Sequence, residues 1–188
     1  MKKTLTALLL VMSTGAASAA SVWVSDNTLN VIGKTALGDY SKIVLTWGDD
    51  IDTVRLRGPG GVAMEAEKIS NFLRKKEVTT IVSAGNSCQS ACAMIWLSGS
   101  ERIAEKDADI GLHFAYIPGS SMETIASEWG WNGVRKTLNE LAIWSYNFYD
   151  GLEIADKDKL FEKMSYNSDL WRLTPEDITD VIGATYDD

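Results

Sequence analysis

Short apolar runs alternate with helical patterns between residues 53 and 114, and this alternation restricts the fold more than any other feature of the sequence. Apolar, β-branched runs bounded by Gly, Asp or Asn predict strands at residues 43–47, 54–57, 79–82 and 110–114. Amphipathic periodicity predicts a helix over residues 62–73, and the stretch 91–97, which is apolar on every side, predicts a buried helix. The order of strands and helices predicts an α/β fold with a mostly parallel sheet.

A single domain is expected after the first nineteen residues. No repeat, low-complexity tract or proline-rich linker divides the chain, and 45% hydrophobic residues in 188 can bury one core of ordinary size. Further helices are expected over residues 132–152 and 157–164, and a last one begins at Thr174-Pro175 and ends at Gly183. We therefore predict one domain over residues 20–188.

The first nineteen residues have the pattern of an export signal. Lys2 and Lys3 precede a short apolar run, and the small residues Ala17-Ser18-Ala19 follow it. The run is too short to span a membrane. We predict a signal peptide over residues 1–19 with cleavage after Ala19, Ala20 being the alternative, and hence a periplasmic or secreted protein whose mature chain has no membrane span.

Export would place the only two cysteines, Cys88 and Cys92, where disulfides persist. Their spacing of four residues brings the Cα atoms of a helix within disulfide range, particularly if the chain turns irregularly at Cys88. Cys92 also lies in an apolar run, where a free cysteine is an ordinary small core residue. The sequence leaves both interpretations open.

Composition excludes several classes of partner. Acidic residues outnumber basic ones by 26 to 18, so no broad positive surface is available for a nucleic acid. His113 is the only histidine, which excludes a multi-histidine metal site and means that any imidazole mechanism must use this residue. No metal and no cofactor are expected.

Ser90 stands where the chain leaves a strand, turns and enters the buried helix. A serine there can present its hydroxyl above the sheet edge, next to the backbone N–H of Ala91, which suits a nucleophile. The Gly-x-Ser-x-Gly motif of lipases is absent, because Cys88 and Cys92 occupy the flanking positions. The alternative is that Ser90 only caps the helix.

Two other segments carry residues suited to the same chemistry. The string Gly58-Pro59-Gly60-Gly61 follows a strand and leaves backbone N–H groups unshielded, as an oxyanion hole requires, although a simple tight turn has the same composition. His113 ends the strand at residues 110–114, where it is either a general base or a buried core histidine.

Together these residues make the chain similar to the Clp-type serine peptidase subunits, within the wider Clp-protease/crotonase fold of repeated ββα units around a mostly parallel sheet. The similarity runs from about residue 53 to 114, with a weaker match at residues 169–183. It implies that Ser90 is the nucleophile, that His113 is the general base, and that Gly61 and Ala91 form the oxyanion hole. The separations along this chain, 29 residues from Gly61 to Ser90 and 23 from Ser90 to His113, are close to the family pattern.

The third catalytic residue is not fixed by spacing. Aligning Leu173-Thr174-Pro175-Glu176 with the equivalent helix start of the family places Asp169 at the position of the acid, and Glu162 and Asp150 remain alternatives. More narrowly, Cys-x-Ser-Ala-Cys followed by Gly-x-His resembles a branch of exported Clp-like proteins.

The resemblance implies an exported, ATP-independent serine peptidase that hydrolyses short or unfolded peptides and assembles into homo-oligomers. A non-catalytic binding or interaction protein with the same fold is the alternative, and acyl-CoA chemistry of the crotonase type is a third hypothesis. The tryptophans after residue 128, among them Trp129, Trp131 and Trp144, predict a subunit contact, because aromatic residues are enriched at interfaces.

Overall fold

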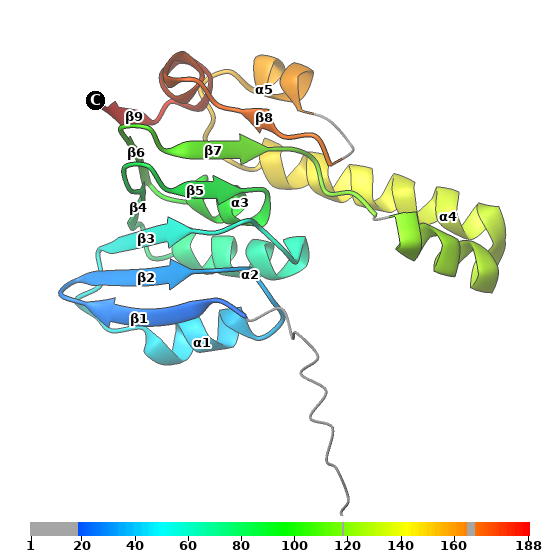
Figure 1. Cartoon of the computed structure of the whole chain (residues 1–188), viewed down its shortest axis with the longest axis horizontal. Helices are drawn as coiled ribbons and strands as arrows, with labels where there is room; N and C mark the ends of the chain where they lie inside the picture. Colours follow the sequence, from blue (N-terminus) through cyan, green and yellow to red (C-terminus); the bar gives the residue numbers. More distant parts are fainter. Residues whose placement is uncertain (1–18, 118, 165–167) are drawn as a thin grey trace, which may run out of the picture.

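A six-stranded sheet forms one wall of the molecule (Figure 1). The computed structural model describes residues 19–117, 119–164 and 168–188, so the predicted signal segment lies outside it except for Ala19. Within the described residues the strand order is β1 (Ser21–Ser25), β2 (Thr28–Ile32), β3 (Thr53–Arg57), β4 (Thr79–Val82), β6 (Glu101–Glu105) and β9 (Thr185–Asp187). Strand β1 runs antiparallel to β2, and the other neighbours are parallel.

A second, three-stranded sheet contains the strands that lead into Ser90 and His113. It consists of β5 (Ser87–Gln89), β7 (Asp109–Leu112) and β8 (Trp171–Arg172), with β5 parallel and β8 antiparallel to β7. The chain passes twice from the large sheet to the small one and then into a helix, as β4–β5–α3 and β6–β7–α4. These are the repeated ββα units that the resemblance implies, and the α/β class with a mostly parallel sheet is confirmed.

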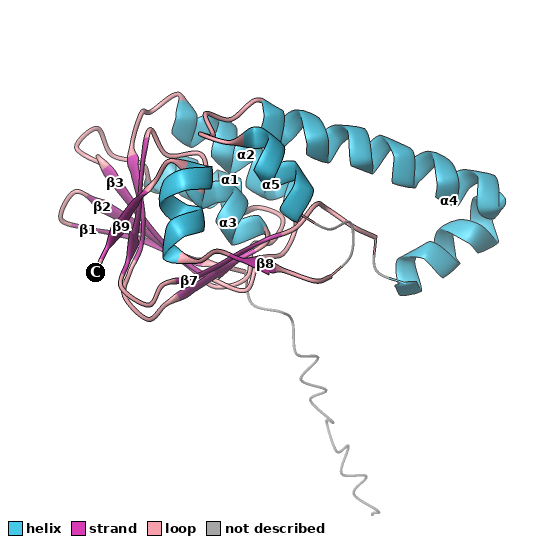
Figure 2. Cartoon of the chain, turned by 90° about the horizontal axis from the view of Figure 1, so that it is seen from above, coloured by secondary structure: helices cyan, strands magenta, loops and turns pink. Residues whose placement is uncertain are grey.

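Helices pack on one side of the large sheet (Figure 2). They are α1 (Asp39–Thr46), α2 (Ala63–Arg74), α3 (Ala91–Trp96), α4 (Gly119–Asp150), α5 (Lys157–Lys163) and a π-helix, η1 (Asp177–Ile182). Every residue of α3 is buried, as its uniformly apolar sequence predicts, and α2 buries Ala66, Ile69 and Leu73 from its apolar face. None of the helices in the described part of the chain is both long and apolar enough to cross a membrane.

Helix α4 extends from the body as an arm (Figures 1 and 2). It begins earlier than the predicted residue 132 and bends at Gly130, whose φ of 68° interrupts the helical geometry. Trp129 and Trp131 flank this bend and are exposed, whereas Trp144 packs on its own chain and donates a hydrogen bond from Nε1 to Glu67 Oε2 (2.9 Å). Trp129 and Trp131 are therefore the tryptophans of this group that remain available to another molecule.

The strand predicted at residues 43–47 is wrong, because residues 43–46 form the end of helix α1 and Trp47 is its C-cap. Tyr40, Ile43 and Trp47 recur at helical spacing and turn toward the core, while Leu45 is 86% exposed. The β-branched residues favour a strand locally. The face formed by Tyr40, Ile43 and Trp47 packs toward the core and α2, and this packing makes the segment helical. The hairpin formed by β1 and β2 precedes α1 and was not predicted.

Candidate active site

Ser90 lies at a sharp turn between β5 and α3. Its backbone has φ 52° and ψ −119°, a conformation that side-chain-bearing residues rarely adopt and that is often found at functional sites. The amide of Ser90 donates to the Gly111 carbonyl (2.8 Å), and its carbonyl accepts from Met94 N (2.9 Å). Within the described residues, the Ser90 hydroxyl makes no capping hydrogen bond to α3. The structure therefore does not support the interpretation of Ser90 as a simple N-cap.

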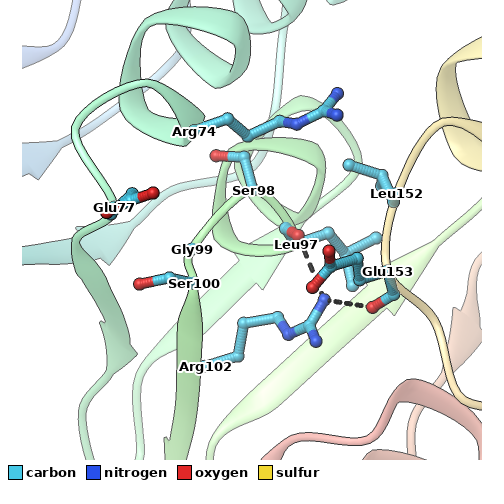
Figure 3. A pocket seen from close by; sticks show the side chains of 9 residues that line it. All are labelled: Arg74, Glu77, Leu97, Ser98, Gly99, Ser100, Arg102, Leu152 and Glu153. Atoms are coloured by element: carbon cyan, nitrogen blue, oxygen red, sulfur yellow. Dashed lines mark hydrogen bonds between the residues drawn. The ribbon is translucent and has the colours of Figure 1, made fainter.

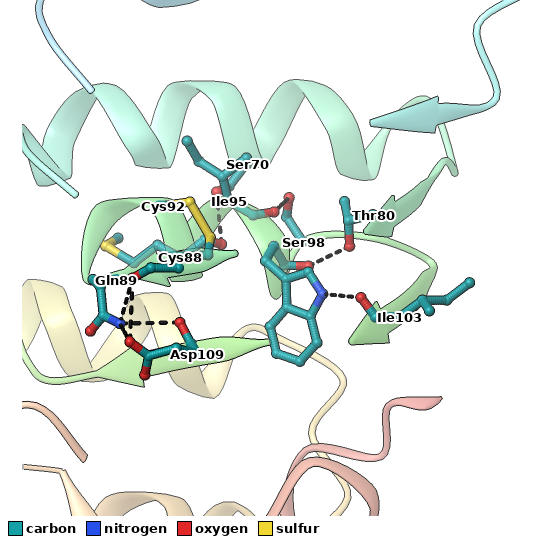
Figure 4. The surroundings of a disulfide bond; sticks show 12 residues. Ser70, Thr80, Cys88, Gln89, Cys92, Ile95, Ser98, Ile103 and Asp109 are labelled. Carbon is teal, nitrogen blue, oxygen red and sulfur yellow. Dashed lines mark hydrogen bonds between the residues drawn. A yellow bond between two sulfur atoms is a disulfide. The ribbon is translucent and has the colours of Figure 1, made fainter. Parts of the chain in front are cut away.

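A disulfide closes the turn around Ser90 (Figure 4). Cys88 at the centre of β5 and Cys92 in the first turn of α3 are bonded, with their Cα atoms 5.1 Å apart. Both cysteines are buried, so Cys92 is a core residue as well as a bridged one. The covalent ring contains Ser90 at its midpoint and joins the strand that leads into the turn to the helix that leaves it.

Hydrogen bonds hold β5 against β7 on the other side of this turn. Gln89 donates from Nε2 to Asp109 Oδ2 (2.8 Å) and to the Asp109 carbonyl (3.1 Å), as Figure 4 shows. Arg172 on β8 binds the same carboxylate and holds the pKa of Asp109 below its usual range. These bonds tie Gln89, the residue that precedes Ser90, to the neighbouring strand β7.

The Gly60–Gly61 turn approaches Ser90 from the end of β3. A Cβ on Gly60 would lie 2.7 Å from the Cβ of Ser90, and one on Gly61 would lie 2.0 Å from the Thr35 carbonyl oxygen. Thr35 N donates to the Gly60 carbonyl and Val62 N donates to the Thr35 carbonyl (both 2.9 Å), a parallel bridge in which the N–H of Gly61 faces away from Thr35. Only glycine fits this close approach.

His113 follows the end of β7, beside the strand that leads to Ser90. Its imidazole is buried, and Nδ1 lies 2.6 Å from the Phe114 carbonyl oxygen. A carbonyl only accepts, so Nδ1 carries the proton of the neutral ring and Nε2 is the acceptor that a general base needs. Burial lowers the pKa of His113, and the hydrogen bond to Phe114 partly offsets this effect. This shift favours the neutral form of the ring, which is the form that can accept a proton.

One cleft of about 590 Å³ brings these groups together. Ser90, Gly61 and His113 all line it, and its walls are mainly apolar, formed by Val62, Met64, Tyr116, Leu141 and Leu170 among others. The cleft also contains Lys34, which is exposed and carries the only fixed charge among its lining residues in the described part of the chain. The cleft therefore offers mainly apolar contacts together with one positive charge.

The three candidate acids lie in different places. Asp169 is exposed and stands between Ser168 and Leu170, both of which line the cleft. Glu162 is exposed on α5, and Asp150 ends α4, where it forms an ion pair with Lys157 (3.6 Å). Of the three, Asp169 is the nearest to the cleft by chain position, while the Phe114 carbonyl is the group that contacts His113 Nδ1.

Sequence reasoning did not single out Thr35, Lys34 or the Phe114 carbonyl. Thr35 and Lys34 follow β2, a strand that was itself not predicted, so nothing placed them beside the glycine turn. The sequence signal near them is Gly33, which follows the apolar residues Val31 and Ile32 and marks a turn. The contribution of Phe114 is a backbone atom, which no residue type can reveal.

A second cavity, of about 500 Å³, lies beyond the other end of α3 (Figure 3). Arg102 donates from Nη1 to the Glu153 carbonyl (2.7 Å) and the Leu97 carbonyl (3.4 Å), and burial lowers its pKa. The hydroxyl of Ser98 donates to Ile95 O (2.6 Å), and that of Ser100 donates to Val78 O (3.1 Å). Both hydroxyls are used in hydrogen bonds to backbone carbonyls, and none of the described residues that line this cavity is a histidine. The described residues contain no group of three or more His, Cys, Asp or Glu that could hold a metal ion.

Comparison with known proteins agrees with this arrangement at the level of the fold. No family model and no curated protein matches the sequence. Among solved structures, a ClpP1 mutant from Listeria monocytogenes superposes with a TM-score of 0.54 at 16% identity, covering 87% of this chain and 91% of that one.

Two structures of mutants of the membrane-bound stomatin-specific protease 1510-N, one in complex with a substrate peptide, give a TM-score of 0.49 each. Their identities are 15% and 16%; each comparison covers 85% of this chain, and they cover 77% and 73% of those chains respectively. The match to ClpP1, together with the ββα units described above, shows that this chain has a Clp-protease-like fold.

Proposed function

We propose that this protein is an exported, ATP-independent serine peptidase in which Ser90 is the nucleophile and His113 the general base. The observation that carries the proposal is the turn at Ser90: a serine with positive φ, enclosed by a disulfide, whose hydroxyl is not used to cap its helix. Such a strained turn is stabilised by its surroundings and presents the side chain to the cleft that His113 and Gly61 also line.

The chemistry follows from the positions of these groups. Ser90 Oγ attacks a peptide carbonyl while His113 Nε2 accepts the hydroxyl proton and then delivers it to the leaving amine. The N–H groups of Gly61 and Ala91 stabilise the oxyanion, an interaction for which each donor contributes on the order of a hundredfold or more in rate. Water then hydrolyses the acyl-enzyme by the reverse sequence of proton transfers.

We propose Asp169 as the residue that orients His113. It lies in the segment bordering the cleft, whereas Asp150 is engaged with Lys157. If Asp169 has this role, Asp169→Asn will lower kcat substantially while leaving the fold intact, and Asp150→Asn and Glu162→Gln will leave kcat unchanged. Wild-type kcat in Asp169→Asn would instead assign the orientation of the ring to the Phe114 carbonyl, which binds Nδ1 in the structure.

The apolar cleft and the fold support short or unfolded peptides as substrates. We also propose assembly into homo-oligomers through the exposed arm, helix α4. Trp129 and Trp131 provide aromatic surface there, of the kind that is enriched at interfaces. Sedimentation of the wild-type chain beside a Trp129→Ser/Trp131→Ser variant tests this part separately from catalysis. The variant is expected to sediment as a smaller species.

Labelling by a fluorophosphonate probe tests the proposed chemistry directly. The purified protein should be labelled at Ser90, identified by peptide mass spectrometry, and Ser90→Ala and His113→Ala should each reduce labelling and peptide hydrolysis about a thousandfold or more. The double variant should lose little beyond either single one, because the two residues act as a unit. Unlabelled but correctly folded wild-type protein would favour the alternative, a non-catalytic binding protein on the same fold.

A further inference from the structure

A buried carboxylate at the start of α1 is bound by the backbone of the first described residues. Asp39 is 0% exposed, and its Oδ2 accepts hydrogen bonds from Ala20 N (3.2 Å) and Ala36 N (2.8 Å). Its Oδ1 accepts from Lys42 Nζ (2.9 Å), which also donates to the Ala20 carbonyl (3.3 Å). A carboxylate removed from water in this way is stable only when its oxygens are bonded and its charge is compensated.

Ala20 is itself held tightly at this position. It is buried, and its Cα packs so closely on Gly33 that a Cβ there would lie 3.3 Å away. The nitrogen that contacts Asp39 is the nitrogen of the Ala19–Ala20 peptide bond, the bond at which the sequence predicts removal of the export signal. Cleavage at this bond would convert a neutral amide with one N–H into an α-ammonium with three.

We propose that the chain is cleaved between Ala19 and Ala20 and that the new α-ammonium of Ala20 forms an ion pair with the buried carboxylate of Asp39. In the hydrolysis the bond between Ala19 C and Ala20 N breaks, the hydroxyl of water joins the Ala19 carbonyl carbon, and the released amine takes the remaining proton and one from solvent. A charge-assisted hydrogen bond is stronger than the neutral one it replaces, and burial strengthens it further.

The position of Asp39 connects this ion pair to the candidate active site. Asp39 also holds Ala36 N, and the buried Glu65 on α2 accepts hydrogen bonds from Gly38 N and Tyr40 N (both 2.9 Å). The segment fixed in this way, residues 36–40, directly follows Thr35, whose backbone groups bridge to the glycine turn at Gly61. The mature N-terminus would thus stabilise the segment that supports the proposed oxyanion amide.

The same geometry selects between the two cleavage positions. Cleavage after Ala20 would remove this buried residue and with it one of the three donors to Asp39, and the new amine would lie on Ser21, which is exposed and belongs to β1. Asp39 would then depend on Lys42, whose side chain is 46% exposed, for its charge compensation. Only cleavage after Ala19 places the new α-ammonium group at the carboxylate of Asp39.

The first test is the intact mass of the protein exported from cells that express the full chain. A mass corresponding to a chain that begins with Ala20 is expected, and one that begins with Ser21 would overturn the proposal. This measurement does not depend on catalysis, so it is decided separately from the proposed peptidase function.

The second test compares the thermal stability of three forms, beginning at Ala19, Ala20 or Ser21, each released from a cleavable fusion without extra residues. The Ala20 form should melt highest, by at least about 3 °C, a shift that is measurable for a domain of this size. In Asp39→Asn the difference between the Ala19 and Ala20 forms should disappear. Lys106→Gln, which removes a distant surface pair with Asp188, is the control and should preserve the difference.

An Ala19 form as stable as the Ala20 form would contradict the ion pair. If Asp39→Asn does not fold, the comparison of the three wild-type forms still decides the question. Blocking the α-amino group of the Ala20 form by acetylation should lower its melting temperature to that of the Ala19 form or below.

Discussion

Two neighbouring turns line the cleft, and both have positive φ values that they reach by different means. At Gly60–Gly61 both residues have positive φ, and neither carries a side chain that would resist it. At Ser90 the φ is also positive, but the residue has a side chain, and a disulfide encloses the turn. Both turns lead from a strand into a helix, α2 in the first case and α3 in the second.

The difference reflects what each turn presents to the cleft. The glycine turn contributes a backbone N–H, so it loses nothing by lacking a side chain. The serine turn must contribute a hydroxyl, so glycine cannot be used and the cost of the strained backbone has to be offset by its surroundings. Covalent closure from Cys88 to Cys92 and the hydrogen bond from Ser90 N to Gly111 O provide that support.

The largest effect is expected when a side chain is added to the glycine turn. Gly61→Ala places a Cβ 2.0 Å from the Thr35 carbonyl oxygen, so the free energy of unfolding should fall by about 3 kcal/mol or more. Gly85→Ala is the matched control, because Gly85 also has positive φ (65°) but has nothing within 4 Å of the added carbon. It should lose only about 1 kcal/mol in denaturant unfolding. Equal losses would show that backbone strain, not the clash with Thr35, limits the glycine turn.

Opening the disulfide should have the next largest effect. Cys88 and Cys92 are the only cysteines in the sequence, so a reductant acts on this bridge alone. The chain-entropy model gives about 2 kcal/mol for so short a ring, and reduction should lower labelling of Ser90 by the fluorophosphonate probe more markedly than it lowers the melting temperature.

Alkylation before and after reduction, read by mass spectrometry, establishes that the bridge was present and then opened. A Cys88→Ser/Cys92→Ser variant should behave as the reduced protein does. Unchanged labelling after reduction would mean that packing and the hydrogen bond to Gly111 hold the serine turn without covalent help.

A smaller effect on stability is expected when Ser90 is replaced by glycine or by alanine. Ser90→Gly relieves the backbone strain and Ser90→Ala retains it, so the glycine variant should be more stable than the alanine variant by about 1 kcal/mol. Both variants lack the hydroxyl and should be equally inactive, which separates stability from catalysis. An alanine variant that is as stable as the glycine variant would indicate that the turn at Ser90 is not strained.

The smallest effect concerns pH. Burial lowers the pKa of His113, so in the folded state the ring stays neutral below pH 6.5, the ordinary value at which it titrates in the unfolded chain. As pH falls from 6.5 toward the folded-state pKa, the unfolded chain binds more protons and stability decreases. Peptidase activity should likewise reach half its maximum below pH 6.5. His113→Gln should remove this part of the stability profile, and peptidase activity that stays at its maximum down to the pH at which the protein unfolds would contradict a histidine base.

The strands and the buried helix between residues 54 and 97 were predicted well, because local patterns of apolar and turn residues specify them. The buried helix that follows Ser90 is apolar on every side, and the strands at residues 54–57 and 79–82 are bounded by clear breaks. The spacing of Gly61, Ser90 and His113 was informative because each stands at the end of a strand, so the fold brings them to one edge.

The N-terminal part was predicted poorly because its structure depends on distant contacts. The segment at residues 43–47 is β-branched, yet Ile43 packs under α2 and the segment is helical. The hairpin of β1 and β2 turns at Asp26, which has a φ of 51°, and its second strand is held by parallel pairing with β3. Neither the helix nor that pairing can be read from the residues alone, and the acid that orients His113 stays a prediction for the same reason.

Because the tryptophans differ in burial, the intrinsic fluorescence of the protein distinguishes its core from its arm. Trp96 is fully buried and donates from Nε1 to the Ile103 carbonyl (3.1 Å), so its emission should be blue-shifted and inaccessible to iodide. Trp129 and Trp131, on either side of the bend in α4, should emit at longer wavelength and be quenched readily. Contact of the arm with another molecule would therefore appear as a loss of the quenchable fraction while the signal of the core stays constant, without any attached dye.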